Sequence, residues 1–309
     1  MEFYSNGKLL ISGEYVVLDG ALAFALPTSF GQSLHIESIE EPKVYWTSYD
    51  VDGEIWMQEQ VSIKQLLSEE EDIHGSAYIQ TLVKVLRAAH QQNPTILKVS
   101  SGFKVESKLT FPRLWGLGTS STWINNVAQW FTINPYQLLQ ESFGGSGYDI
   151  ACARHRHSLV YQLTNPIHPK VELADFNPPF AQQIYFVYLN EKQSSKAAIV
   201  AYREKKGLIH KEIQRITEIS NALARTNDVE VFKGLLVEHE TILSEILEIQ
   251  PIQKRLFADF KGTIKSLGAW GGDFVMAVSE EDPTDYFKNK GYATVLPYQK
   301  MITLPKNKT

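Results

Sequence analysis

The chain has 309 residues, of which 43% are hydrophobic and 21% are charged, and its formal net charge is −5. This composition is typical of a globular protein, and the acidic balance argues against nucleic acid or an anionic membrane as a partner. A single cysteine, Cys152, excludes an internal disulfide, and no apolar run approaches the roughly 20 residues that cross a bilayer. We therefore expect a cytoplasmic enzyme or binding protein with no nucleic-acid or membrane partner.

The first half of the chain predicts strands that alternate with helices. Apolar runs and polar–apolar alternation are typical of half-buried strands. On these patterns we expect strands at residues 8–12, 14–18, 33–39 and 103–111, with a hairpin over 40–62. Apolar residues at i, i+3, i+4 and i+7 predict a helix over 76–91, another after Ser121 and a short one after Pro135.

The second half predicts longer helices. Strands are expected at 158–163 and 184–189, and the proline-rich stretch 165–179 between them is the expected domain junction. Leu/Ile-rich stretches with a helical period predict helices, and an apolar run predicts a strand after them. These elements are expected at 196–225, 229–249 and 252–266, and at 274–278. The predicted organisation is two domains, residues 1–175 and 176–309.

A glycine-rich loop carries the strongest local signal. Residues 116–122 read Gly-Leu-Gly-Thr-Ser-Ser-Thr, between a predicted strand and a predicted helix. The N–H groups at the start of a helix attract anions, and glycines let the backbone approach a phosphate closely. A plain helix cap with hydroxyl side chains accounts for the loop equally well when it is taken alone.

Three weaker features also suggest a phosphate or proton-transfer site. The glycine-rich turn 268–273 could form a backbone nest for a phosphate, or a bulged hairpin turn. Asp149 follows the bend 144–147 and could accept a proton or cap a helix. Lys8 opens an apolar strand, where it could stabilise developing charge or lie exposed at an edge.

The order of these segments along the chain resembles the GHMP kinases, the family of galactokinase, homoserine kinase, mevalonate kinase and phosphomevalonate kinase. The resemblance spans residues 7–274 and rests on Gly-Lys-Leu-Leu-Ile-Ser-Gly-Glu-Tyr, Gly-Leu-Gly-Thr-Ser-Ser, Gly-Ser-Gly-Tyr-Asp and Gly-Ala-Trp-Gly-Gly-Asp. The segments 13–20, 145–149 and 192–196 are most similar to phosphomevalonate kinases.

The resemblance implies a two-domain α+β fold with the active site in the cleft between the domains. The N-terminal domain would be ribosomal-protein-like α/β, and the C-terminal domain would be ferredoxin-like α+β. ATP and Mg²⁺ would be the cofactors, and a small-molecule acceptor would be the other partner. The implied reaction is transfer of the γ-phosphoryl group to that acceptor.

The resemblance also implies the roles of individual residues. Lys8 and Asp149 would be catalytic, and Ser120 and Glu141 would hold the metal. The phosphates of ATP would contact Gly116, Leu117, Gly118, Thr119, Ser120 and Ser121. The acceptor would contact Glu14, Tyr15, Ser146, Gly147, Ser194, Ser195, Gly268, Ala269, Gly271 and Gly272.

We expect the acceptor to be phosphomevalonate first and mevalonate second. A sugar-1-kinase and a diphosphomevalonate decarboxylase remain open, because both have the same fold. A non-catalytic ligand-binding relative also remains open, because Trp270 replaces a glycine of the last motif and Glu141 matches the usual metal-binding glutamate only loosely. Monomer and homodimer are both possible.

Overall fold

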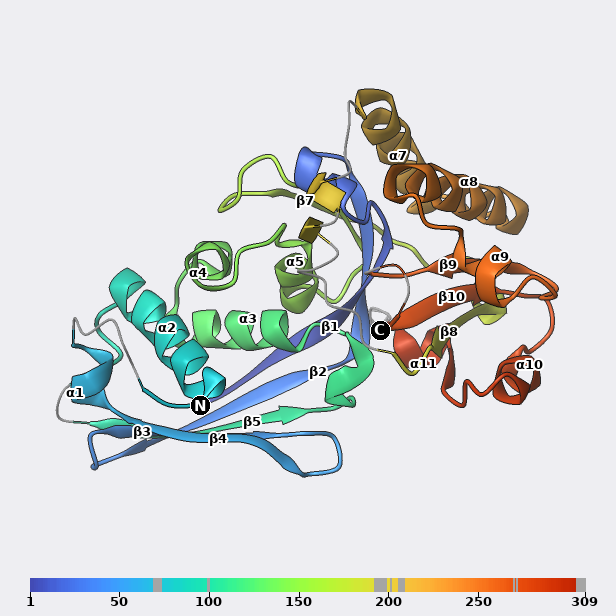
Figure 1. Ribbon diagram of the computed structural model, residues 1–309. Coiled ribbons are helices and arrows are strands. Elements are labelled where there is room, and N and C mark those ends of the chain that lie inside the picture. Colours follow the sequence, from blue (N-terminus) through green and yellow to red (C-terminus); the bar gives the residue numbers. More distant parts are fainter. Residues whose placement is uncertain are drawn as a thin grey trace, which may run out of the picture.

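The computed structural model describes residues 1–68, 74–98, 101–191, 199–200, 202–204, 209–268, 270 and 272–303. Two sheets organise this part of the chain, and helices pack against both (Figure 1). No helix among the described residues is long and apolar enough to cross a membrane.

The first sheet contains seven strands from the N-terminal half. They are β1 (Glu2–Ser12), β2 (Ala23–Ile39), β3 (Lys43–Tyr49), β4 (Ile55–Ser62), β5 (Gly102–Leu109), β6 (Leu159–Gln162) and β7 (Lys170–Leu173). The long strand β2 pairs with β1, β5 and β6, so it connects the two parts of the sheet. The predicted hairpin over 40–62 is confirmed as the antiparallel pair β3–β4.

Helices cover one face of this sheet (Figure 1). The helical elements of this half are η1 (Val16–Asp19), α1 (Ile63–Leu66), α2 (Ala77–Gln92), η2 (Arg113–Trp115), α3 (Thr119–Phe131), α4 (Pro135–Ser142) and α5 (Tyr148–Arg154). Both α3 and α5 pack directly on β1. Their first turns therefore lie close to the residues of that strand.

The alternation of side chains along β1 divides the strand between two cores. Leu10 packs in the core beneath the helices, whereas Leu9 and Ile11 pack in a second core on the opposite face. Successive side chains of a strand point to opposite faces, so Lys8 shares the face of Leu10. The second core joins the two halves of the molecule, because it also contains Phe186 and Phe274.

The second sheet contains four strands in the order β11-β8-β10-β9. The strands are β8 (Ile184–Tyr188), β9 (Thr263–Ser266), β10 (Phe274–Val278) and β11 (Val295–Pro297). The helical elements of this half are η3 (Ala181–Gln183), α7 (His210–Leu223), α8 (Val229–Leu247), α9 (Ile252–Leu256), α10 (Thr284–Asn289) and α11 (Tyr298–Met301).

After this sheet the chain returns to the first one. Ile302 forms an isolated antiparallel bridge with Thr28, and the Thr303 N–H donates to the carbonyl of Pro27 at 3.2 Å. The chain therefore connects the two sheets twice, at residues 173–184 and again at 297–303. The predicted boundary between residues 175 and 176 stays a prediction.

Two of the expected elements are wrong. Residues 14–18 do not form a strand, because Gly13 and Tyr15 have left-handed backbones (φ 91° and 64°) that turn the chain into η1. The helix expected over 252–266 ends at Leu256, and its last part is the fully buried strand β9. The helix expected over 196–225 is seen as α7, and part of the remainder lies outside the described residues.

Candidate active site

The glycine-rich loop connects η2 to α3, and its geometry requires glycine at two positions. Gly116 and Gly118 have left-handed backbones with φ of 68° and 96°. A Cβ on Gly116 would lie 2.5 Å from Cγ of Asp273, and a Cβ on Gly118 would lie 2.7 Å from Oγ of Ser121. Since any larger residue would be strained and would clash, the loop is built for close packing against its neighbours.

Lys8 holds this loop against β1. Its backbone N–H donates to the carbonyl of Leu117 at 2.9 Å, and its ammonium donates to the carbonyl of Gly116 at 2.9 Å. The ammonium also lies 5.9 Å from the centre of the Tyr148 ring, at the first turn of α5. Lys8 is therefore a partly buried cation between the glycine loop and α5, not an exposed edge residue.

Asp149 lies in the first turn of α5, close enough to Lys8 for the ammonium to act on its carboxylate. Its Oδ1 accepts the N–H of Ile150 at 3.1 Å. Burial raises the pKa of Asp149, while the Lys8 ammonium and hydrogen bonds from Ile150 and the Ser121 hydroxyl favour the ionised form and limit that rise. Lys8 and Ser121 thus both act on Asp149, although the three residues come from three separate segments.

The hydroxyls of the loop face different surroundings. Ser121 is buried, and its hydroxyl also donates to the carbonyl of Gly118 at 2.8 Å. Ser120 is exposed in the first turn of α3, where its hydroxyl can reach a ligand. Among the described residues, no group of three or more His, Cys, Asp or Glu side chains could hold a metal ion.

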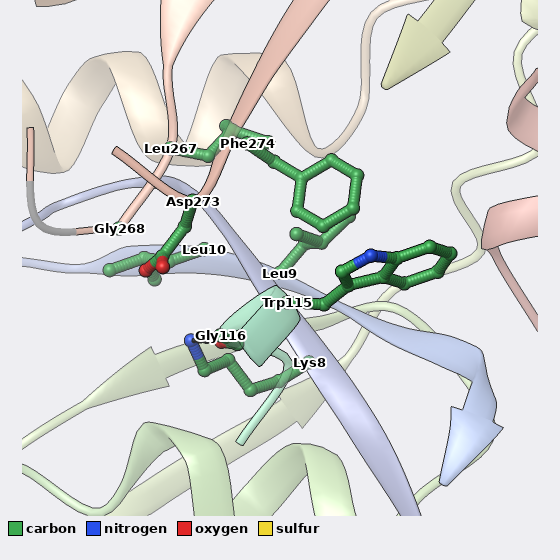
Figure 2. A pocket seen from close by; sticks show the side chains of 9 residues that line it. All are labelled: Lys8, Leu9, Leu10, Trp115, Gly116, Leu267, Gly268, Asp273 and Phe274. Atoms are coloured by element: carbon green, nitrogen blue, oxygen red, sulfur yellow. Dashed lines mark hydrogen bonds between the residues drawn. The ribbon is translucent and has the colours of Figure 1, made fainter. Parts of the chain in front are cut away.

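A narrow pocket opens beside Lys8 (Figure 2). We call its two sides the N-terminal wall and the C-terminal wall. The N-terminal wall consists of Lys8, Leu9, Leu10, Trp115 and Gly116, and the C-terminal wall consists of Leu267, Gly268, Asp273 and Phe274. The pocket therefore lies where the two halves of the chain meet.

Asp273 is a site residue that the sequence did not identify. The residue is 8% exposed, its carboxylate packs against Gly116, and its N–H donates to the carbonyl of Glu191 at 2.6 Å. The glycines of the turn 268–273 predict a phosphate nest or a hairpin turn, and that pattern assigns no role to its terminal carboxylate. The contact with Gly116 joins segments more than 150 residues apart, so no local pattern indicates it.

The expected acceptor residues are only partly brought together. Gly268 lies in the C-terminal wall, and Ser146 and Gly147 form the bend that leads into Asp149. Gly272 is buried beside Asp273. The remaining residues of the two segments lie outside the described part of the chain, namely Ser194, Ser195, Ala269 and Gly271.

Three expected site residues have other surroundings. Glu14 is 1% exposed and its carboxylate is bonded to Lys265, while the ring of Tyr15 packs against Tyr202 at 5.5 Å. Neither lines the pocket. Glu141 is exposed on α4, where its carboxylate accepts hydrogen bonds from Gln92 and Gln137. The expected pairing of Glu141 with Ser120 at a metal therefore has no support in the geometry.

A network of neutral side chains supports the start of α3 from beneath. The hydroxyl of Thr122 donates to Oε1 of Gln32 at 2.6 Å, and Nε2 of Gln32 donates to the hydroxyl of Ser107 at 2.6 Å. Asn126 donates to the carbonyl of Gln32 and accepts from the hydroxyl of Ser5. We call these five buried residues the neutral network. It fixes α3, and with it the glycine loop, on β1, β2 and β5.

Comparison with solved structures shows that the chain has the fold of the GHMP kinases. A mevalonate kinase from Methanococcus jannaschii is 17% identical, with 96% of each chain covered and a TM-score of 0.69. A Streptococcus pneumoniae phosphomevalonate kinase in complex with phosphomevalonate and AMPPNP is 15% identical, with 94% of this chain and 95% of that chain covered and a TM-score of 0.68. A Lactococcus lactis galactokinase complexed with galactose is 14% identical, with 98% and 95% covered and a TM-score of 0.68.

The expected α+β GHMP kinase fold is thus confirmed. The sequence itself matches no protein-family model and no curated protein. The solved structures with this fold act on different acceptors, so the fold by itself does not select one of them.

Proposed function

We propose that the chain is an ATP-dependent kinase that phosphorylates phosphomevalonate, with mevalonate as the second choice of acceptor. The observation that carries this proposal is the meeting of Lys8, Ser121 and Asp149 at the glycine loop that opens α3. A cation, a partly buried carboxylate and helix N–H groups at one place are what phosphoryl transfer needs, because that reaction depends on positioning and charge neutralisation.

The phosphates of ATP would lie against the start of α3. The backbone N–H groups of the first turn have no helical partner and attract anions, and Gly116 and Gly118 keep side chains out of the way. Mg²⁺ usually keeps several water molecules and binds through substrate phosphates and one or two protein groups. The exposed Ser120 hydroxyl fits such a site, and bound Mg²⁺ would neutralise phosphate charge there.

Asp149 and Lys8 would act on the acceptor. The ammonium of Lys8 would stabilise charge on the attacking oxygen and on the group in transfer. With mevalonate the attacking group is a hydroxyl, and Asp149 would accept its proton. With phosphomevalonate the attacking oxygen belongs to a phosphate that is already ionised, so Asp149 would orient it. The two acceptors therefore differ in how much they need the carboxylate.

Support for the choice of acceptor comes from the sequence and from the comparisons. The segment Gly-Ser-Gly-Tyr-Asp at 145–149 is similar to phosphomevalonate kinases, and a phosphomevalonate kinase is among the solved structures with this fold. Sugar-1-kinase and decarboxylase activities stay as alternatives within the fold. The alternative that is not an enzyme is a non-catalytic, ligand-binding relative.

The test is release of ADP with ATP and Mg²⁺ against a panel of acceptors. The panel contains phosphomevalonate, mevalonate, diphosphomevalonate, homoserine, galactose and other sugars, with carbon dioxide release measured in parallel. We expect the wild type to turn over phosphomevalonate. If mevalonate is the acceptor instead, we expect Asp149→Asn or Lys8→Met to lower kcat by about 10²–10⁴-fold.

Matched variants on the surface serve as controls. Asp175→Asn and Lys254→Met change exposed residues outside the pocket and should keep full turnover. Full turnover of Asp149→Asn with a hydroxyl acceptor would contradict the proposed role of Asp149. If no acceptor gave ADP release while ATP still raised the melting temperature, the non-catalytic alternative would be favoured.

A further inference from the structure

Four buried ionisable residues lie where the two halves of the chain meet, outside the pocket. Glu14 follows β1, His239 and Glu240 belong to α8, and Lys265 belongs to β9. Their exposed fractions are between 0% and 4% of the side chain. We call these four residues the junction cluster. Charged groups are rarely buried without a partner, so the contacts of the cluster need an account.

The central contact is an ion pair between distant segments. The Lys265 ammonium donates to Oε1 of Glu14 at 2.6 Å and to the carbonyl of Ser266 at 2.8 Å. Oε1 of Glu240 lies 4.0 Å from the same ammonium and accepts the N–H of Ser266 at 3.1 Å. The pair with Glu14 thus crosses between the halves, whereas Glu240 stays within the C-terminal half.

His239 adds a second link across the junction. Its Nε2 accepts the N–H of Gly13 at 2.9 Å, which requires that Nε2 carry no proton. Burial and the nearby Lys265 ammonium lower the pKa of His239 well below its usual range, so the ring is neutral. The two residues that follow β1 are therefore held by a neutral histidine and by an ion pair.

The junction cluster is tied to the same two segments that form the pocket. Lys8, Leu9 and Leu10 of the N-terminal wall lie on β1, and Gly13 and Glu14 directly follow the last residue of that strand. Leu267 and Gly268 of the C-terminal wall directly follow Ser266. The carbonyl of Ser266 accepts from Lys265 and its N–H donates to Glu240, so both groups are bonded to the cluster. A shift of Glu14 relative to Lys265 would move one wall of the pocket against the other.

We infer that Glu14 and Lys265 are positioning residues, whose ion pair holds the two walls in the relative position required for the proposed phosphoryl transfer. The inference rests on that proposed function for its kinetic consequence only. A buried ion pair adds little net stability over apolar residues of similar size, but its directional bonds can select one arrangement. Glu14, expected from the sequence to bind the acceptor, would act through Lys8 and the turn at Gly268.

The experiment compares two charge-neutralising changes in the full chain, Glu14→Gln and Glu240→Gln. Hydrogen exchange is measured for peptides from both walls, residues 5–12 and 263–274, and for the distant hairpin 43–62. We expect Glu14→Gln to raise exchange in both wall peptides at least tenfold while the hairpin keeps its protection. The matched control Glu240→Gln should leave peptide 5–12 unchanged, because Glu240 has no bond to β1.

Kinetics gives the second measurement. With the acceptor that the panel identifies, Glu14→Gln should lower kcat at least tenfold and leave the KM for ATP within twofold. A merely structural role predicts instead a loss of folded protein with unchanged constants per folded molecule. If the wild type turns over no acceptor, the proposed function fails, and the hydrogen-exchange comparison still decides the positioning role.

A second variant addresses the case in which Glu14→Gln folds poorly. Glu14→Met combined with Lys265→Met removes both members of the pair, so neither of their charges is left buried without the other, and such replacements are well tolerated. We expect its melting temperature to recover, with wall exchange still raised and kcat still low. Recovery of kcat together with the melting temperature, or an equal rise of exchange along the whole chain, would overturn the inference.

Discussion

The two walls of the pocket are each supported by buried polar groups, which are neutral beside one wall and ionisable beside the other. Beneath the glycine loop, the neutral network is built from hydroxyls and amides only. Beside the C-terminal wall, the junction cluster combines two carboxylates, an ammonium and an imidazole. In that cluster Oε2 of Glu14, Oε2 of Glu240 and Nδ1 of His239 have no hydrogen-bond partner among the described residues.

The difference shows how the two halves are joined to the site. A network of satisfied neutral groups holds one arrangement at any physiological pH. A cluster with more carboxylates than cations is stable only when its charges are partly neutralised, so its contribution depends on protons and on every partner being present. We therefore expect the helix side of the pocket to be fixed and the junction side to respond to conditions.

Lys265→Met should have the largest effect on stability, because it leaves the Glu14 carboxylate buried without its cation. Breaking a buried pair from one side costs about 3–5 kcal/mol in the free energy of unfolding. Urea denaturation of the wild type and the variant measures this cost. A loss below about 1 kcal/mol would show that the junction cluster is not held by the ion pair.

The next largest effect is expected in the pH dependence of the free energy of unfolding, which should distinguish the junction cluster from the neutral network. Burial raises the pKa of Glu240 to about 7, from an ordinary value of 4.5. Between these values only the folded chain keeps the proton, so the free energy of unfolding should fall as pH rises from about 4.5 to 7, by roughly 3 kcal/mol. Subtracting the profile of Glu240→Gln isolates this change, and identical profiles for the two proteins would contradict it.

Thr122→Val tests the neutral network. The substitution keeps the shape of the side chain but leaves Oε1 of Gln32 buried without a donor, which costs about 1–3 kcal/mol. The cost should be the same at pH 5 and pH 8, in contrast to the junction cluster. Thr122→Ser, which keeps the hydroxyl, is the matched control, and thermal and urea unfolding give the values. A cost that varies with pH would erase the distinction between the two regions.

The smallest effect is expected at an exposed ion pair, which shows what burial adds. Arg215 donates to both carboxylate oxygens of Glu238 at 2.6 and 2.8 Å, and its side chain is 45% exposed. Arg215→Ala should cost about 0.2–1 kcal/mol, less at high salt. A cost equal to that of Lys265→Met at any salt concentration would mean that burial is not the source of the difference.

Local patterns predicted much of the fold and pointed to the residues at the centre of the candidate site. Helical spacing placed α2 to within a residue at its ends, and glycines with hydroxyls identified the loop before α3. Short motifs surround both Lys8 and Asp149, which is why the sequence places both of them in the candidate site. The strand β9 was missed because four consecutive buried residues show no alternation, and an adjoining helical pattern extended over them.

The junction cluster could not be predicted, for a physical reason. Lysine is almost always exposed, so nothing in the sequence indicates that Lys265 is fully buried. Its partner Glu14 lies 251 residues earlier, and the pair exists only because both halves fold around it. The carboxylate of Asp273 was missed for the same reason, since its packing partner is Gly116.

The two crossings of the chain between the sheets have a mechanical consequence. A body attached at one point can swivel in any direction, but a body attached at two points turns only about the line through them. The segments 173–184 and 297–303 are such attachments, so we expect any opening of the pocket to be a rotation about one axis. Deleting residues from Tyr298 onward would remove one attachment, and small-angle scattering should then record a broader range of shapes, whereas an unchanged profile would refute the single axis.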